Sequence, residues 1–355
     1  MKKEDIVILF LGIIVLFIIG ITSYFLASVL LPFIVAVLLS IIFRPAVVFL
    51  MEKKVPMALS LFVVVICCAL LLGIISFIIY NSVESFMVDF PKYEEKFNQK
   101  TTGLMQYVND IAVGMGFNPD DLNVSNILTF STVSGFMGGF AGVFFNLFGN
   151  VVMVLLFMLF LLGSTGDSGP KMYRAFSKAN ADRIKHLLDN ITKSVRTYLV
   201  KKSLISLLIG SLYALITWLF GMDFPIFWGF LAFILNFIPN VGSLVGTVFP
   251  VLFSLVQFDS FLSTIILLVL LVVAQNIVGN GLEPMVFSES LDLSPVLILI
   301  ALIFWGFLWG IVGMLLAVPL TATIKIICEN IDPLKPVAVL MGGNRITKAV
   351  KTPKQ

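Results

Sequence analysis

The chain has 355 residues, of which 59% are hydrophobic and only 12% are charged, and its mean hydropathy is +1.07. Soluble globular domains carry about 25% charged residues, so this composition excludes a soluble protein and predicts an all-α protein that crosses a membrane several times. The net charge of +3 is small. The position of the charges along the chain is therefore more informative than their sum.

The N-terminal part of the chain is predicted to form four membrane spans. An apolar helix of about 20 residues is long enough to cross a bilayer. Residues 1–80 contain three such segments, and a fourth follows later; they lie at 6–26, 27–50, 57–80 and 143–163.

Two polar segments adjoin these spans and are predicted to be amphipathic helical insertions. Residues 81–142 carry three lysines against seven carboxylates, with aromatic residues at helical spacing from Phe86 to Phe97. Residues 164–202 carry nine Lys and Arg against three carboxylates. Because an excess of Lys and Arg marks cytoplasmic loops, residues 164–202 are predicted to be cytoplasmic and residues 81–142 extracytoplasmic.

A C-terminal membrane core is predicted at residues 203–328, followed by a basic cytoplasmic tail at 329–355. From 203 to 324 the sequence contains five carboxylates and no Lys, Arg or His. Asn, Gly and Pro interrupt its apolar runs at 236–242 and 275–284, where we expect broken helices. Lipid cannot satisfy a freed backbone group, so such breaks survive only against protein or a water-filled cavity. Interrupted hydrophobic segments of this kind indicate a transport site.

The charge pattern is consistent with two counts of membrane spans. The simplest count is eight, with both termini in the cytoplasm. The alternative has six full spans, with residues 224–255 and 261–292 as re-entrant hairpins. Both arrangements place the basic tail inside, so the sequence leaves both open.

Glu283, which is followed by Pro284, is the strongest candidate for a functional carboxylate. A charge at membrane depth costs about 2.5–3.5 kcal/mol on insertion scales and is a functional hypothesis by default. Asn276 and Asn280 precede it at helical spacing, so one helical face could offer oxygen atoms to a cation or a polar ligand. The alternative is that Glu283 ends a helix in the headgroup region. The other four carboxylates of the core are expected at loop ends or helix caps.

The predicted pathway for a solute or ion lies at the two interruptions. At the first, Pro239 ends a helix and Gly242 permits a tight backbone; the alternative is an interfacial turn between two ordinary spans. The residues predicted to line the pathway are Asn236, Pro239, Asn240, Gly242, Gln275, Asn276, Asn280, Glu283 and Pro284.

No catalytic group, metal site or cofactor is expected. The only histidine is His186, and the three cysteines have no metal-ligand spacing. No nucleophile–base pair or phosphate-binding loop is present, so an enzyme is the poorest interpretation. The only small ions invoked are H⁺ or Na⁺ as coupling ions.

Three segments of the core resemble the AI-2E family of bacterial membrane proteins, also described as autoinducer-2 exporters or PerM-like permeases. They are Asp223–Pro239, Asn276–Leu291 with Leu293–Pro295, and Phe304–Pro319. The resemblance covers nearly the whole chain. It implies a transporter of the bacterial inner membrane that forms homo-oligomers; some members are associated with autoinducer-2 export and others with sodium–proton antiport.

Three functions follow as hypotheses. The first is secondary export of a small polar molecule, driven by an ion gradient. The second is sodium–proton antiport with Glu283 as the exchanging carboxylate. The third is a membrane scaffold that transports nothing. The expected partners are a small polar solute or monovalent cation, membrane lipids and further copies of the chain, and no nucleic acid.

Overall fold

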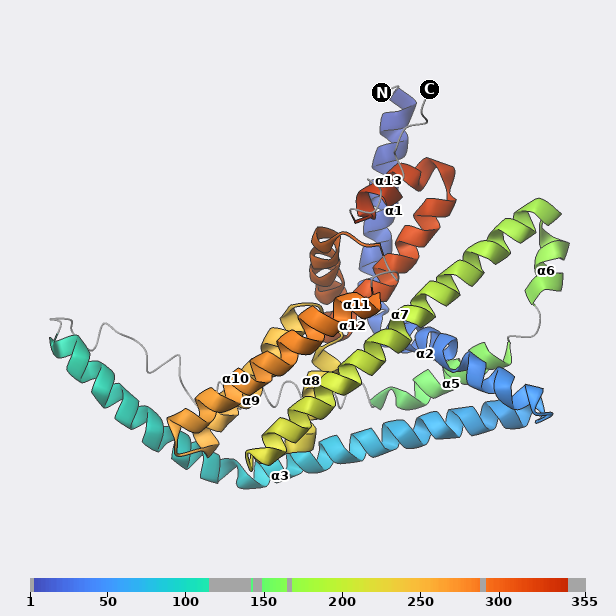
Figure 1. Cartoon of the computed structure of the whole chain (residues 1–355). Coiled ribbons are helices and arrows are strands. Elements are labelled where there is room, and N and C mark those ends of the chain that lie inside the picture. The colour runs from blue at the N-terminus through green and yellow to red at the C-terminus, as the bar shows by residue number, and fades with distance from the viewer. Residues whose placement is uncertain (1–2, 115–141, 143–148, 165–167, 288–291, 344–355) are drawn as a thin grey trace, which may run out of the picture. The chain divides into compact units, whose positions relative to one another are not determined.

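The computed structural model describes residues 3–114, 142, 149–164, 168–287 and 292–343. The regular elements in these ranges are all helices (Figure 1). They are α1 (Lys3–Phe25), α2 (Ala27–Glu52), α3 (Met57–Gly114), α5 (Val151–Gly163), α6 (Ser168–Ala175), α7 (Lys178–Leu219), α8 (Pro225–Leu235), α9 (Val241–Gln257), α10 (Phe261–Gln275), the π-helix η3 (Asn276–Leu282), α11 (Glu283–Phe287), α12 (Pro295–Asn330), the 3₁₀-helix η4 (Asp332–Leu334) and α13 (Lys335–Met341).

Five of the described helical segments are long and apolar enough to cross a membrane. They are Ala27–Glu52, Met57–Ser82, Lys178–Leu219, Phe261–Phe287 and Pro295–Asn330. Three shorter apolar helices, α5, α8 and α9, have 13, 11 and 17 residues. The chain is therefore an all-α membrane protein, as the composition predicted, whereas the count of eight spans stays a prediction.

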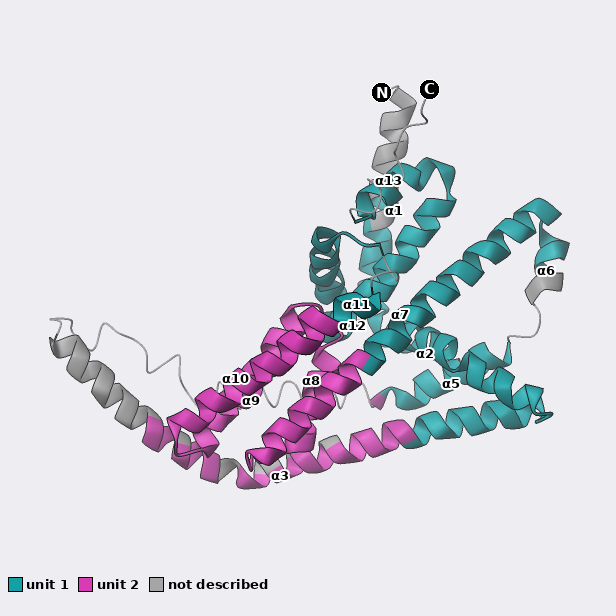
Figure 2. Ribbon diagram, viewed as in Figure 1, with its two compact units in different colours: residues 1–70, 150–204, 283–355 teal, residues 71–149, 205–282 magenta. Residues whose placement is uncertain are grey.

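The chain divides into two compact units (Figure 2). Unit 1 comprises residues 1–70, 150–204 and 283–355, and unit 2 comprises residues 71–149 and 205–282.

Unit 1 contains two apolar cores that share helix α2. The first core packs α2 against the start of α3 and against α5, with Ala36, Cys68 and Met158 at its centre. The second packs α7 against α12 through buried residues such as Val195 and Ala322, with Ile41 of α2 beside them.

Helix α12 folds back on itself at Trp309 and Gly310. Both residues leave helical geometry, and Gly310 has φ +62° and ψ −144°, a conformation that glycine adopts far more readily than other residues. Across the bend, the Trp305 Nε1 donates a hydrogen bond to Thr321 Oγ1 at 3.3 Å. A Cβ atom on Gly313 would collide with the carbonyl oxygen of Trp305. These contacts join residues on opposite sides of the bend, so α12 is an antiparallel helical hairpin.

Gly310→Ala is expected to lower the free energy of unfolding by about 1–3 kcal/mol, because alanine strains this backbone conformation. Gly73→Ala is the matched control, since a Cβ atom there meets nothing within 4 Å. Thermal unfolding in detergent should show a lower midpoint for Gly310→Ala than for Gly73→Ala. Equal midpoints would contradict the bend.

Unit 2 contains a second helical hairpin, formed by α8 and α9. The chain leaves the helix after Leu235 and re-enters it at Val241, with Pro239 in the turn. A Cβ atom on Gly246 would lie 3.7 Å from Ala232, and the rings of Trp228 and Phe253 lie 5.3 Å apart. Ala232, late in α8, meets Gly246, early in α9, whereas the earlier Trp228 meets the later Phe253. This reversed order places the two helices antiparallel. This geometry is that of the hairpin alternative for residues 224–255.

At the second expected interruption, residues 275–284, the helix is not broken. The chain stays helical throughout: α10 ends at Gln275, η3 winds as a π-helix to Leu282, and α11 follows directly. A re-entrant hairpin at 261–292 is therefore wrong for residues 261–287. Local π-helical winding accommodates extra residues within a helix and occurs frequently at functional sites.

The two expected polar insertions are described only in part. Residues 81–114 continue α3 without interruption, whereas 115–141 and 143–148 lie outside the described residues. The expected insertion at 164–202 contains α6 and the polar first half of α7. The expected tail at 329–355 contains η4 and α13, and residues 344–355 lie outside the described part.

Candidate functional site

Glu283 forms an ion pair with Lys202 inside unit 1. The Lys202 Nζ lies 2.5 Å from the Glu283 Oε1. The Lys202 side chain is 3% exposed and that of Glu283 is 28% exposed. Lys202 belongs to α7, and Glu283 is the first residue of α11. The candidate carboxylate therefore faces a buried ammonium group.

A second contact attaches the same two helices. The Lys201 Nζ donates a hydrogen bond to the carbonyl oxygen of Val286 at 2.7 Å. Successive lysines of α7 thus hold both the start and the middle of α11. Pro284, between these two contacts, is exposed.

The Lys202–Glu283 pair compensates a buried charge. A buried charge is tolerated only while its partner compensates it, because desolvation disfavours an isolated ion. Loss of the negative charge of Glu283 would leave the Lys202 ammonium without its partner. The contact between α7 and α11 therefore depends in part on this pair of opposite charges.

Lys325 forms a second buried ion pair, on α12. Its Nζ donates a hydrogen bond to the carbonyl oxygen of Asp292 and lies 3.3 Å from the Asp292 Oδ2. Glu329 Oε1 lies 3.4 Å from the same Nζ. Asp292 was expected at a loop end or as a helix cap, and the described contacts of Ser294, the N-cap of α12, include no side-chain capping bond. Asp292 lies in the loop before α12, and it also compensates a buried lysine.

The pathway residues of η3 are bonded among themselves. The Asn280 Nδ2 donates to the Asn276 Oδ1 at 2.7 Å, and the Asn276 Nδ2 donates to the carbonyl oxygen of Val272 at 2.8 Å. Both asparagines are exposed. A Cβ atom on Gly279 would lie 3.0 Å from the Gln275 Nε2, so Gln275 covers that turn. Asn276 and Asn280 are thus joined to each other, whereas Glu283 is joined to Lys202.

The first interruption brings Asn236 against α7 within unit 2. Asn236 is buried, and its Nδ2 donates to the Ser206 Oγ at 3.0 Å. Asn240 is exposed and has φ +60°, and its carbonyl oxygen accepts from the Ser243 Oγ at 2.9 Å. Gly242 is buried where a Cβ atom would collide with the carbonyl oxygen of Leu235. Asn236 and Gly242 therefore face the packed side of the turn, and Asn240 faces outward.

The family model for AI-2E family transporters matches residues 11–332. The chain belongs to the AI-2E transporter family. This match spans both interruptions, both hairpins and the two buried ion pairs.

Several members of this family resemble the chain over most of their length. It is 29% identical to the AI-2 transport protein TqsA of Escherichia coli strain K12, over 85% of this chain and 86% of the relative. It is 30% identical to "Putative transport protein YhhT" of the same strain, over 86% of both chains. A relative from Borreliella burgdorferi is 39% identical over 56% of this chain and 55% of the relative. Members of the AI-2E family are transport proteins and not enzymes.

In this AI-2E chain, the polar half of α3 holds the ends of the α8–α9 hairpin within unit 2. The Tyr93 hydroxyl donates to the Asp223 Oδ2 at 2.6 Å. Lys100 donates to the carbonyl oxygens of Leu255 and Val256 at 3.0 and 3.2 Å, and lies 3.8 Å from Asp259. Burial and the bond to Asp223 raise the pKa of Tyr93, and burial lowers the pKa of Lys100. Asp223 therefore has a specific structural partner and is more than a solvated loop end.

The sequence interpretation missed Lys202 and Lys325. They are the lysines that flank the cation-free stretch 203–324, and each is paired with a carboxylate of that stretch. A signal was present, because a buried carboxylate needs a cation and the nearest cations in the sequence were these two. The sequence places Lys202 in the basic cytoplasmic segment 164–202, where a lysine needs no partner other than water.

Proposed function

We propose that this AI-2E family member is a secondary transporter of the bacterial inner membrane that exports a small polar molecule and uses the proton gradient. The Lys202–Glu283 pair carries the proposal, because a carboxylate held against a buried lysine is the kind of group through which carriers couple to protons. The cargo class is supported by similarity to the AI-2 transport protein TqsA, which points to a molecule like autoinducer-2. The predicted pathway residues at both interruptions remain part of this proposal.

Proton coupling acts through the attachment of α11 to α7. When Glu283 is ionised, the ion pair and the Lys201–Val286 bond hold the two helices together. When Glu283 takes up a proton, the electrostatic part of this attachment is lost. Two states that differ in proton binding and in helix contact are the minimum that a coupled carrier requires.

The test uses everted membrane vesicles and purified protein in liposomes. Uptake of labelled autoinducer-2 into everted vesicles, which corresponds to export from the cell, is expected in the native protein when a proton gradient is present. It should fall at least about tenfold in Glu283→Gln. Glu84→Gln is the matched control, because Glu84 is an exposed carboxylate of α3 that forms none of the ion pairs among the described residues, and it should leave transport unchanged. Gradient-driven transport that persists in Glu283→Gln would contradict the proposed role of Glu283.

Sodium–proton antiport is the second candidate, because the exposed edge of Glu283 could exchange a cation. A dye inside the vesicles would then report proton movement when sodium is added, and Glu283→Gln would abolish it. Movement of labelled cargo without any response to sodium favours export. A scaffold is favoured only if neither cargo nor ions move.

The two helical hairpins support a membrane topology of six crossings with both termini in the cytoplasm. The crossings would be α1, α2, the first half of α3, the segment that contains α5, the second half of α7, and α10 with η3 and α11. The α8–α9 hairpin would enter from outside and the α12 hairpin from inside. An even number of crossings returns the basic tail to the side of Lys2 and Lys3.

Cysteine labelling separates this topology from eight spans. In a variant without native cysteines, Ser260→Cys should react with a membrane-impermeant maleimide on intact spheroplasts, because residue 260 then lies outside. Eight spans would place the same residue inside. Lys178→Cys is the control that must stay unlabelled until the membrane is opened. Ser260→Cys that labels only after opening would contradict six crossings.

A further inference from the structure

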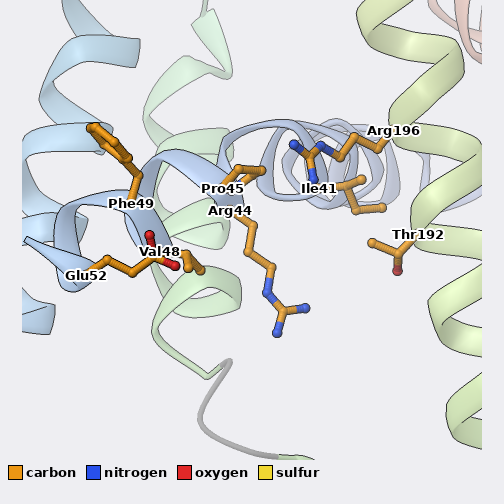
Figure 3. A pocket seen from close by; sticks show the side chains of 8 residues that line it. All are labelled: Ile41, Arg44, Pro45, Val48, Phe49, Glu52, Thr192 and Arg196. Carbon is orange, nitrogen blue, oxygen red and sulfur yellow. The ribbon is translucent and has the colours of Figure 1, made fainter.

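A pocket of about 440 Å³ lies between α2 and α7 in unit 1. Arg44 of α2 and Arg196 of α7 line it from the two helices, and Thr192 lies one turn before Arg196 (Figure 3). Its volume is within the range of about 300–1,000 Å³ that is typical of small-molecule sites. None of the transport residues discussed above lines it.

The two arginines are available to bind an anion. Both side chains belong to exposed residues. Among the ion pairs of the described residues, no carboxylate lies within 4.0 Å of either guanidinium group. Glu52 is the only acidic residue of the lining, so the pocket carries a net positive charge. Guanidinium groups bind phosphate oxygens in bidentate fashion, and a threonine hydroxyl can donate a further bond.

The rest of the lining favours a lipid over a free anion. Ile41, Pro45 and Val48 follow one another at helical spacing on α2 and give the pocket an apolar side. A free phosphate ion gains nothing from such a surface, whereas the glycerol and acyl chains of a phospholipid do. The pocket also lies near the end of a candidate membrane span, next to Lys53 and Lys54. Basic pockets between membrane helices bind acidic headgroups.

We infer that the α2–α7 pocket binds the phosphate headgroup of an anionic phospholipid, with Arg44 and Arg196 as its ligands. Glu52 at the rim disfavours a second acidic headgroup, so we expect one lipid per pocket. The site is independent of the proposed transport chemistry and persists whether or not Glu283 couples transport.

The experiment measures lipid binding to the full-length protein in a neutral detergent by native mass spectrometry. Titration with phosphatidylglycerol should show one retained lipid at concentrations where phosphatidylcholine gives none. Arg44→Gln with Arg196→Gln should weaken phosphatidylglycerol binding by roughly tenfold or more. Lys185→Gln with Lys193→Gln is the matched control, because it removes the same charge from exposed positions of α7 outside the pocket, and should leave binding unchanged.

Two further measurements separate lipid binding from misfolding and from binding of free phosphate. Arg44→Lys with Arg196→Lys keeps the charge and should retain part of the binding, which a misfolded protein would not. Inorganic phosphate added in excess should fail to displace the lipid. The inference is overturned if both double Gln variants lose binding equally, if neither does, or if phosphate alone binds with the same dependence on the arginines.

Discussion

Glu283→Leu is expected to lower the free energy of unfolding by about 3–5 kcal/mol, which is the usual cost of breaking a buried ion pair by removing one partner. The change leaves the Lys202 ammonium, with 3% of its side chain exposed, without a compensating charge. Lys202→Met should cost less, because the Glu283 carboxylate it strands is 28% exposed and can reach water. The order of the two single variants is therefore part of the prediction.

Combining Lys202→Met with Glu283→Leu should recover most of the lost stability, since no buried charge remains. Unfolding in mixed detergent micelles, followed by tryptophan fluorescence, measures all four members of this cycle. The double variant should nevertheless stay inactive in proton-driven efflux. A double variant as unstable as the sum of the two single variants would show that the residues do not act as a pair. One that regains efflux would remove the pair from the transport mechanism.

The class of fold could be predicted from the sequence because it follows from composition and the length of apolar runs. The location of the first helix break could also be read from Pro239 and Gly242, since proline and glycine act through their own backbones. The antiparallel packing of α8 on α9 could not. It depends on contacts such as that between Trp228 of α8 and Phe253 of α9, which are far apart in the sequence.

The second interruption shows that residue types which favour a helix break do not always cause one. Asn, Gly and Pro between Gln275 and Pro284 predicted a break, but the chain accommodates them as π-helix and stays helical through Phe287. Conversely, α12 bends at Gly310, outside the two places where the sequence predicts a break. A glycine in an apolar run can be a kink, a packing contact or neither, and only its surroundings decide between them.

Only one member of the ion pair in the candidate site, Glu283, could be predicted from the sequence. Glu283 stands out in the sequence because a carboxylate is costly among apolar residues. Its partner does not stand out, because Lys202 is one of nine basic residues in a polar segment. Lys202 and Glu283 are 81 positions apart, so their pairing depends on the tertiary structure. The burial of the Lys202 side chain results from the packing of α7 and α11 and cannot be read from the sequence.

Gly242→Ala is expected to disrupt the turn between α8 and α9. A Cβ atom at this position would overlap the carbonyl oxygen of Leu235, and its next neighbours are the carbonyl carbon of Leu235 and the Cβ of Ile238, at 2.6 and 3.2 Å. The nearest obstacle is backbone and cannot rotate away, so the turn must move. Overpacking of this kind costs about 1–3 kcal/mol, and we expect the upper end of that range.

Gly246→Ala provides the matched comparison, one turn later on the same helix. It is also buried, but its nearest contact for a Cβ atom is Ala232 at 3.7 Å, an ordinary van der Waals distance. Alanine also favours a helix over glycine, so this variant should be neutral or slightly more stable. Thermal unfolding should separate the two variants clearly, and cargo efflux should fall only in Gly242→Ala. Equal unfolding midpoints would show that residues 236–242 do not form the tight turn on which the α8–α9 hairpin depends.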